Sequence, residues 1–299
     1  MSNGFLYLAT VAIWGSSWLG IKLQLGVVAP EMSVAYRFVV ASALLLGWCW
    51  LRGLRMRFSA REHLFIALQG LPLFSVNYIL FYFASAYLTS GLVAVAFSTI
   101  VVMNIGFGAL LLGRPVRPRV AAGAILGLGG LSLVFWEDLA RFDLDSAGLI
   151  GLGLSLIATM SASLGNVASA RNQRAGIPVV QSNAFGMVYG ALFTLLAAAI
   201  QGVPLTFDPS PVYVGALLYL ALFASVFGFG AYLTLLGRIG PDRAAYASVV
   251  FPIVALGLST VFEGFEWTLP AFAGVFLVLA GNVLVLAPRS RTHLAPTGR

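Results

Sequence analysis

The stretch Trp14-Gly15-Ser16-Ser17-Trp18 decides the fold class of this chain, because it places small and polar residues inside a run that is otherwise apolar. The surrounding segment from Phe5 to Leu23 carries one charge, on Lys22. A water-soluble amphipathic helix would carry polar residues at every third or fourth position along one face. Two interpretations of the stretch stay open. Either its small residues let a neighbouring helix approach closely, or its face lines a polar cavity.

The composition extends this apolar character to the whole chain. Of the 299 residues, 60% are hydrophobic and 9% are charged, whereas about 25% are charged in a typical globular domain. The mean hydropathy is +0.96. So few charges could not cover the surface of a water-soluble protein of this length, and we therefore expect the solvent to be lipid. The single cysteine, Cys49, excludes an internal disulfide.

Ten segments are long enough to cross a hydrocarbon core of about 30 Å, which takes roughly 20 helical residues. They lie near residues 4–24, 32–51, 64–87, 91–112, 119–136, 147–169, 179–201, 212–236, 244–262 and 268–287. The first run has no Lys or Arg before it and no small-residue cleavage site after it, which favours a retained helix over a signal peptide. The predicted fold class is an all-α polytopic membrane protein with ten transmembrane helices.

Basic and acidic residues fall in alternate links between the predicted spans. Arginines gather in residues 52–62, 113–119, 171–174 and 238–243 and in the tail after residue 288, whereas most acidic residues fall in the other links. With ten spans, all these arginines lie on one side, and the positive-inside rule predicts that both termini are cytoplasmic. The net charge of +7 therefore indicates membrane orientation. Nucleic-acid binding is not expected, because the aromatic residues are not interleaved with basic ones.

An internal repeat becomes visible when the chain is shifted by 151 residues. Five spans fall in each half, and because five is odd, the second half must be inverted in the membrane. We therefore predict two repeats, residues 1–140 and residues 141–299, the second with a short cytoplasmic tail. Inverted repeats are typical of secondary transporters that bind substrate near the midplane, although duplication without transport stays an alternative. The shift superimposes three pairs of glycines: Gly113 on Gly264, Gly123 on Gly274, and Gly130 on Gly281.

The stretch from Trp14 to Trp18 resembles the first-helix signature of the drug/metabolite transporter superfamily, EamA type. Arg37, in Ala35-Tyr36-Arg37-Phe38, resembles the arginine common in the second helix of that family. Residues 82–90 resemble the end of its third helix, and residues 264–281 resemble the closing stretch of its repeat. Within the family, the general likeness is to the YddG-type amino-acid exporters.

The resemblance implies two inverted five-helix repeats around a central cavity, with helices 1–4 and 6–9 as its walls and helices 5 and 10 at the periphery. It also implies export of small metabolites. The chain departs from the family pattern at three places: Arg114 follows the glycine that closes helix four, Val101 stands opposite Pro252, and residues 161–166 replace the tryptophan motif in the second half.

Polar side chains at membrane depth cost free energy unless they meet a partner or water, so they are the candidates for a site. For each of them, hydrogen bonding between helices or interfacial anchoring stays an alternative. Arg37 lies about 9 Å deep, at about 1.5 Å per residue, where it could attract a carboxylate or bind carbonyls of a neighbouring helix. With their aromatic neighbours, the predicted substrate-binding residues are Trp14, Ser17, Trp18, Arg37, Asn77, Tyr78, Phe81, Tyr82, Ser98, Ser163, Asn166, Tyr232, Tyr246 and Ser248.

A nearly uncharged cavity of rings, amides and hydroxyls suits neutral or zwitterionic solutes. We therefore predict an exporter in a bacterial inner membrane, working by alternating access on amino acids, both aromatic and other neutral ones. The alternatives are an importer, a broad-specificity drug exporter, or a non-transport protein such as a lipid-handling enzyme. No enzymatic activity, catalytic residue, metal or cofactor is expected, because His63 and His293 are far apart in the sequence. The expected partners are a small-molecule substrate and the bilayer, and a monomer is expected, with a dimer as the alternative.

Overall fold

The computed structural model describes residues 1–24, 26–84, 86–88, 90–142, 146–262 and 267–286. Within these ranges all regular secondary structure is helical, which confirms the all-α class. The first half holds α1 (Asn3–Lys22), α2 (Pro30–Leu51), α3 (Ala60–Leu71), η1 (Pro72–Val76), α4 (Asn77–Ala84), α5 (Ser90–Ser98), α6 (Ile100–Leu112), α7 (Pro118–Val134) and α8 (Trp136–Ala140). The second half holds α9 (Ser146–Arg174), α10 (Val179–Ile200), α11 (Pro211–Tyr219), η2 (Leu220–Phe229), α12 (Gly230–Ile239), α13 (Pro241–Ala244), α14 (Ala247–Phe262) and α15 (Leu269–Leu286).

Seven helical runs in the described part of the chain are long and apolar enough to cross a membrane. They correspond to seven of the ten predicted segments. The helix α7 is apolar but has only 17 residues. The structure therefore confirms a multi-pass helical membrane protein, while the count of ten spans and their division into two inverted repeats stay predictions. The seven runs are Pro30–Leu51, Ala60–Ala84, Leu92–Leu112, Ala147–Arg174, Val179–Ile200, Pro211–Ile239 and Leu269–Leu286.

Two of these runs contain a stretch of π-helix, η1 and η2, that the sequence analysis did not predict. Pro72, the first residue of η1, has no backbone N–H to donate into the helix. In η2 the hydroxyl of Ser225 donates to the carbonyl of Leu220, five residues earlier, at 3.0 Å. Such wide turns inside α-helices are frequent at functional sites, and both stretches here contribute to the cavity described below.

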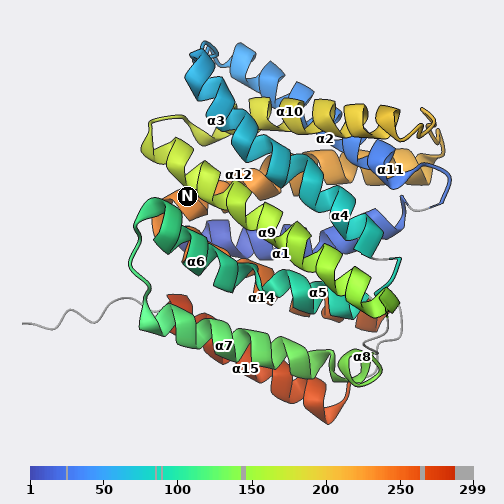
Figure 1. Ribbon diagram of the computed structural model, residues 1–299, viewed down its shortest axis with the longest axis vertical. Coiled ribbons are helices and arrows are strands. Elements are labelled where there is room, and N and C mark those ends of the chain that lie inside the picture. Colours follow the sequence, from blue (N-terminus) through green and yellow to red (C-terminus); the bar gives the residue numbers. More distant parts are fainter. Residues whose placement is uncertain (25, 85, 89, 143–145, 263–266, 287–299) are drawn as a thin grey trace, which may run out of the picture.

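The antiparallel pair α7 and α15 forms one edge of the molecule (Figure 1). Glycines make this close packing possible. A Cβ atom added to Gly130 would lie 2.6 Å from the carbonyl oxygen of Gly274, and one added to Gly123 would lie 2.9 Å from that of Gly281. Both distances are too short for a real side chain, so only glycine fits at these crossing points.

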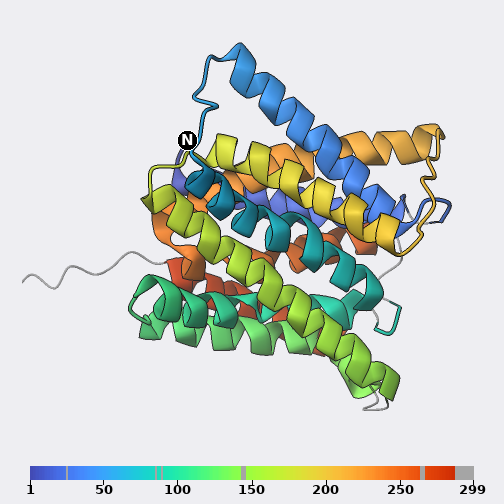
Figure 2. The ribbon, with the colours of Figure 1, turned by 45° about the horizontal axis from the view of Figure 1, so that its top comes forward.

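The remaining helices form the body of the molecule beside that pair. The helices α2 and α10 pack along each other at the opposite edge, and α1 and α9 run between the two edges (Figures 1 and 2). The helix α1 packs against η2, α12 and α14, whereas α9 packs against α3, α4 and α6. Residues from both halves of the sequence therefore meet in the middle of the fold.

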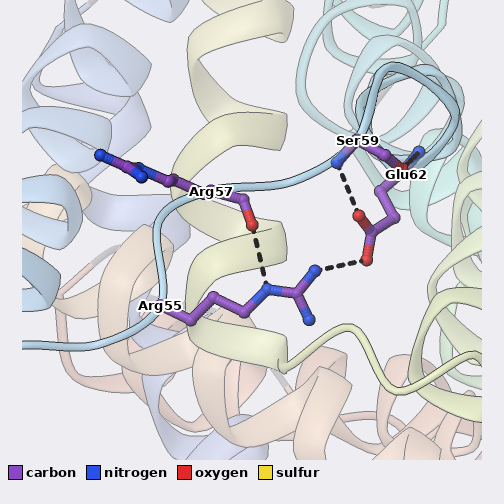
Figure 3. A network of polar contacts seen from close by, with 4 residues as sticks. All are labelled: Arg55, Arg57, Ser59 and Glu62. Atoms are coloured by element: carbon purple, nitrogen blue, oxygen red, sulfur yellow. Dashed lines mark hydrogen bonds and ion pairs between the residues drawn. The ribbon is translucent and has the colours of Figure 1, made fainter.

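The links that carry the arginines lie at one end of the molecule, together with the N-terminus (Figures 1 and 2). At this end Ser59 caps α3: its hydroxyl accepts from the backbone N–H of Glu62 at 3.2 Å, and its own N–H donates to the Glu62 carboxylate at 2.6 Å (Figure 3). Arg55 donates to the same carboxylate and to the carbonyl of Arg57, both at 2.9 Å. This reciprocal capping fixes where α3 begins.

A second acidic residue at the arginine-rich end, Asp242 of α13, lies 4.0 Å from both Arg114 and Arg117. Arg174 joins the group by donating to the carbonyl of Leu112 at 3.1 Å. Burial lowers the pKa of Arg114, and the neighbouring guanidinium of Arg174 lowers it further, while Asp242 opposes the shift. Positive charge is therefore in excess at this end, as the charge pattern predicted.

Candidate substrate cavity

A cavity of about 170 Å³ lies between the two halves of the chain. Its walls come from α1, α2, η1, α4, α5, α6, α9, η2, α12 and α14. Aromatic rings dominate the lining, and amide, hydroxyl and guanidinium groups interrupt it. The lining residues are Trp14, Ser17, Ile21, Arg37, Leu73, Asn77, Tyr78, Phe81, Tyr82, Val93, Phe97, Ile100, Ala162, Asn166, Phe229, Tyr232, Ser248 and Phe251.

Trp14 sits in a corner of the cavity made by the second half of the chain. Its indole N–H donates to the carbonyl of Ala224 in η2 at 3.2 Å. Its ring lies 5.1 Å from that of Phe229, 4.8 Å from that of Tyr232 and 6.4 Å from that of Phe251, measured between centroids. Such tilted and edge-on contacts hold an aromatic side chain in one orientation. Trp14 is therefore fixed in place before any ligand arrives.

Both interpretations of the opening stretch hold, for different residues. A Cβ atom on Gly15 would lie 2.6 Å from Cβ of Val254, so this glycine allows close contact between α1 and α14. The hydroxyl of Ser16 bonds that of Tyr219 at 2.6 Å, which ties α1 to α11. Ser17 lines the cavity beside Trp14. The side chain of Trp18, also predicted to bind substrate, lies outside the described part of the structure.

Arg37 extends from α2 into the cavity wall and is only 5% exposed. Its Nε donates to the hydroxyl of Ser225 at 2.8 Å, and its Nη2 lies 3.5 Å from the hydroxyl of Tyr78. The guanidinium carbon is 5.1 Å from the centroid of the Tyr78 ring and 5.3 Å from that of Phe38. Among the residues that the structure describes, no carboxylate forms an ion pair with Arg37.

Two asparagines face the cavity from opposite halves of the chain, Asn77 from α4 and Asn166 from α9. The amide nitrogen of Asn166 donates to the hydroxyl of Tyr232 at 3.0 Å. The Oδ1 atoms of both asparagines are buried and accept no hydrogen bond from any described residue. A buried polar atom without a partner costs about 1–3 kcal/mol, so a bound ligand or water would stabilise both positions.

Of the other predicted site residues, Phe81, Tyr82 and Ser248 also line the cavity. The structure thus brings ten of the fourteen candidates to one place, counting Trp14, Ser17, Arg37, Asn77, Tyr78, Asn166 and Tyr232 described above.

Three candidates lie outside the lining, and each uses its hydroxyl to join two helices. Ser98 donates to the carbonyl of Ala94 in its own helix at 2.9 Å and approaches that of Ser248 at 3.4 Å. Ser163 donates to Asn104 at 2.6 Å. Tyr246 donates to the carbonyl of Gly123 at 3.0 Å. Hydrogen bonding between helices, the alternative considered for every polar residue, accounts for these three.

The helix α10 was expected to wall the cavity, but it contributes no lining residue. It packs instead against α2, α3 and η1. Its polar residues meet a buried network there: Ser182 donates to Gln69 at 2.6 Å, and Gln69 donates to Asn183 at 3.3 Å. The helices α7 and α15 also stay out of the lining, in agreement with their expected peripheral position.

Sequence reasoning missed the apolar part of the lining, above all Phe97, Phe229 and Phe251. A phenylalanine has no distinguishing signal in a chain of apolar helices, so the polar residues and their aromatic neighbours do not reveal these three. One signal did exist, because the shift of 151 residues places Phe229 on Tyr78 and Tyr232 on Phe81. Applied residue by residue, the repeat would have pointed to Phe229.

The sequence model of the EamA-like transporter family matches residues 2–136 of the chain and, a second time, residues 149–287. The inner membrane transporter YedA of Escherichia coli strain K12, itself uncharacterised, is 30% identical over 263 residues, which cover 86% of this chain and 81% of YedA. A protein of Salmonella typhimurium named as a probable amino-acid metabolite efflux pump is 27% identical over 306 residues, which cover 93% of each chain.

A solved crystal structure superimposes on 95% of this chain and 96% of its own with a TM-score of 0.78. At 18% sequence identity this likeness shows the fold alone. The two matches of the family model together cover most of the sequence, and each falls on one of its halves. The chain therefore belongs to the EamA-like transporter family.

Proposed function

We propose that this protein exports amino acids, aromatic and other neutral ones, across a bacterial inner membrane by alternating access at the cavity. One observation carries the proposal. Two asparagines of the cavity lining, Asn77 and Asn166, have buried amide oxygens that no described residue satisfies, and aromatic rings make up much of the rest of the lining. Hydrogen-bond acceptors surrounded by π faces are a suitable environment for an ammonium group attached to an apolar body.

The size of the cavity favours small metabolites over drugs. Pockets for drug-sized ligands have volumes of about 300–1,000 Å³, and this cavity measures about 170 Å³. The name of the Salmonella relative, a probable amino-acid metabolite efflux pump, supports the same substrate class and the outward direction.

The glycine contacts of α7 and α15 support two inverted repeats of five spans. In the sequence shift, Gly123 corresponds to Gly274 and Gly130 corresponds to Gly281. In the fold, Gly123 meets Gly281 and Gly130 meets Gly274. The contact between Gly123 and Gly281 thus corresponds, residue for residue, to the contact between Gly274 and Gly130. A two-fold axis in the membrane plane produces this relation between two repeats. The cavity would then lie between two halves that rock against each other.

The orientation follows from the arginine-rich end of the molecule. By the positive-inside rule, this end faces the cytoplasm, and both termini lie there. The naming of YedA as an inner membrane transporter supports the inner membrane as the location.

Flux measurements test the proposal. Purified protein is reconstituted into liposomes loaded with radiolabelled amino acids or, separately, with a cationic dye. We expect saturable, protein-dependent movement of amino acids. Movement of the dye alone would indicate a drug exporter, and no movement of either from demonstrably folded protein would overturn the transport proposal.

Two tyrosines provide a matched pair of variants. Tyr232→Phe removes a hydroxyl in the cavity lining that accepts a hydrogen bond from the amide of Asn166. Tyr246→Phe removes a buried hydroxyl that lies outside the lining. Tyr232→Phe loses the hydrogen bond from Asn166, and Tyr246→Phe loses those to the carbonyls of Gly123 and Val278; each bond is worth about 0.5–1.5 kcal/mol of stability. Only Tyr232→Phe should raise the KM of transport. Equal KM values for both variants would contradict the assignment of this cavity as the site where the transported substrate binds.

A further inference from the structure

We propose that Arg37 binds the carboxylate of the substrate, so that the cavity selects solutes that carry both a carboxylate and an ammonium group. This inference rests on the proposed function and names the chemical class and the orientation of the bound molecule. The carboxylate lies at Arg37, and the ammonium group lies at the amide oxygens of Asn77 and Asn166.

The charge of Arg37 has no counterpart in the described structure. A guanidinium stays positively charged at any physiological pH, and this one is 5% exposed. Its partners are the neutral hydroxyls of Ser225 and Tyr78 and the rings of Phe38 and Tyr78. Burying a charge is costly unless it is paired. A substrate carboxylate would supply the missing negative charge, whereas a solute without a carboxylate would not.

The donors of Arg37 are arranged to receive a planar anion. Ser225 donates its own hydroxyl hydrogen to Leu220 and therefore accepts from Nε of Arg37, which fixes one side of the guanidinium. On the other side, the Nη2 contact with Tyr78 is long, at 3.5 Å, and Nη1 has no partner among the described residues. Two parallel N–H groups on Nη1 and Nη2 match the two oxygens of a carboxylate.

Two asparagines of the same lining offer groups of the opposite character. The Oδ1 atoms of Asn77 and Asn166 can accept hydrogen bonds but cannot donate them, and both are without a described partner. An ammonium group supplies three donors. The rings of Trp14 and Phe251 lie in the lining of the same cavity and offer apolar surface to a side chain. A zwitterion satisfies both Arg37 and the asparagine oxygens, whereas an amine satisfies the oxygens alone.

Competition experiments on wild-type proteoliposomes test this assignment. The flux of radiolabelled phenylalanine is measured against unlabelled phenylalanine, phenylalaninamide and 3-phenylpropionate, which keep both charges, only the ammonium, or only the carboxylate. We expect phenylalaninamide to compete at least tenfold more weakly than phenylalanine, and 3-phenylpropionate to compete better than the amide. Competition by phenylalaninamide equal to that by phenylalanine would overturn the role of Arg37 while leaving transport itself established.

Variants of Arg37 separate the charge from the shape of the group. Arg37→Gln should raise the KM for phenylalanine at least tenfold and should erase the preference for phenylalanine over its amide. Arg37→Lys keeps the charge without the forked donors and should retain part of the preference. An unchanged preference in Arg37→Gln would refute the assignment. If Arg37→Gln does not fold, the competition series on wild type and the Arg37→Lys variant decide the question.

A binding measurement distinguishes failure of this inference from failure of the proposed function. Thermal unfolding of the detergent-solubilised protein is followed with and without each compound. Stabilisation by phenylalanine and not by phenylalaninamide would support the carboxylate site even if no flux is found. Equal stabilisation by both compounds, or by neither, would count against it.

Discussion

Replacing Gly228 by alanine tests whether the position of Trp14 shapes the cavity. A Cβ atom at residue 228 would lie 2.7 Å from Nε1 of Trp14 and 3.2 Å from its Cδ1. Non-bonded atoms prefer separations of about 3.5–4.0 Å, so the indole must move by roughly 1 Å. Gly230→Ala is the matched control, because a Cβ atom there has no neighbour within 4 Å.

The indole cannot move freely, because it is held on several sides. Its hydrogen bond to Ala224 is already 3.2 Å long, and the rings of Phe229 and Tyr232 lie against it. Losing the hydrogen bond costs about 0.5–1.5 kcal/mol, and overpacking a buried site typically costs about 1–3 kcal/mol. The change from glycine to alanine returns about 0.4–1 kcal/mol through the unfolded chain. The middle of these ranges gives an expected net loss of about 2 kcal/mol.

If that loss falls on the substrate-binding state, it corresponds to roughly a 30-fold increase in KM. The assay is initial phenylalanine flux in proteoliposomes at several concentrations, with monodispersity in detergent as the folding check. Gly230→Ala should transport like wild type. An unchanged KM in folded Gly228→Ala, or equal damage in both variants, would refute the role assigned to Trp14.

Two further predictions concern the scaffold. Gly130→Ala should lower the thermal unfolding midpoint in detergent, because overpacking against α15 costs about 1–3 kcal/mol. Gly129→Ala is the control: the added atom has no neighbour within 4 Å, so the midpoint should stay the same or rise by the gain expected for alanine. Equal midpoints in the two variants would contradict the close packing of α7 against α15. At the start of α3, Glu62→Ala should speed amide hydrogen exchange in the first turn of the helix. Glu62→Gln should keep the first turn protected, because glutamine can still cap the helix although it loses the ion pair with Arg55. Equally fast exchange in both variants would assign the protection to the ion pair.

The location of the helices could be predicted from the sequence, because lipid requires long apolar runs and charges mark the links between them. Segment 64–87, for example, is observed as the run Ala60–Ala84. The π-helical stretches could not be foreseen in the same way. Pro72 indicated an irregularity in the helix but not its geometry, and η2 contains no proline at all.

The cavity could be predicted only in part, because polarity at membrane depth has two explanations that look alike in sequence. Asn166 lines the cavity and Ser163, one turn earlier, bonds Asn104 in the neighbouring helix. Tyr232 and Tyr246 are both buried tyrosines, yet only the first reaches the lining. Which explanation applies depends on the rotation of each helix, and a nearly uniform apolar surface does not determine that rotation.

The pairing of α7 with α15 has a consequence for how the chain is made. The helix α7 is synthesised early, whereas α15 follows most of the second half. Until then Gly123 and Gly130 of α7 lack the helix that packs most closely against them. A chain cut short before Leu269 would leave these two glycines without the helix that they contact. Synthesis of the closing helix thus completes the packing of α7, and chains truncated before Leu269 should be less stable than the full chain.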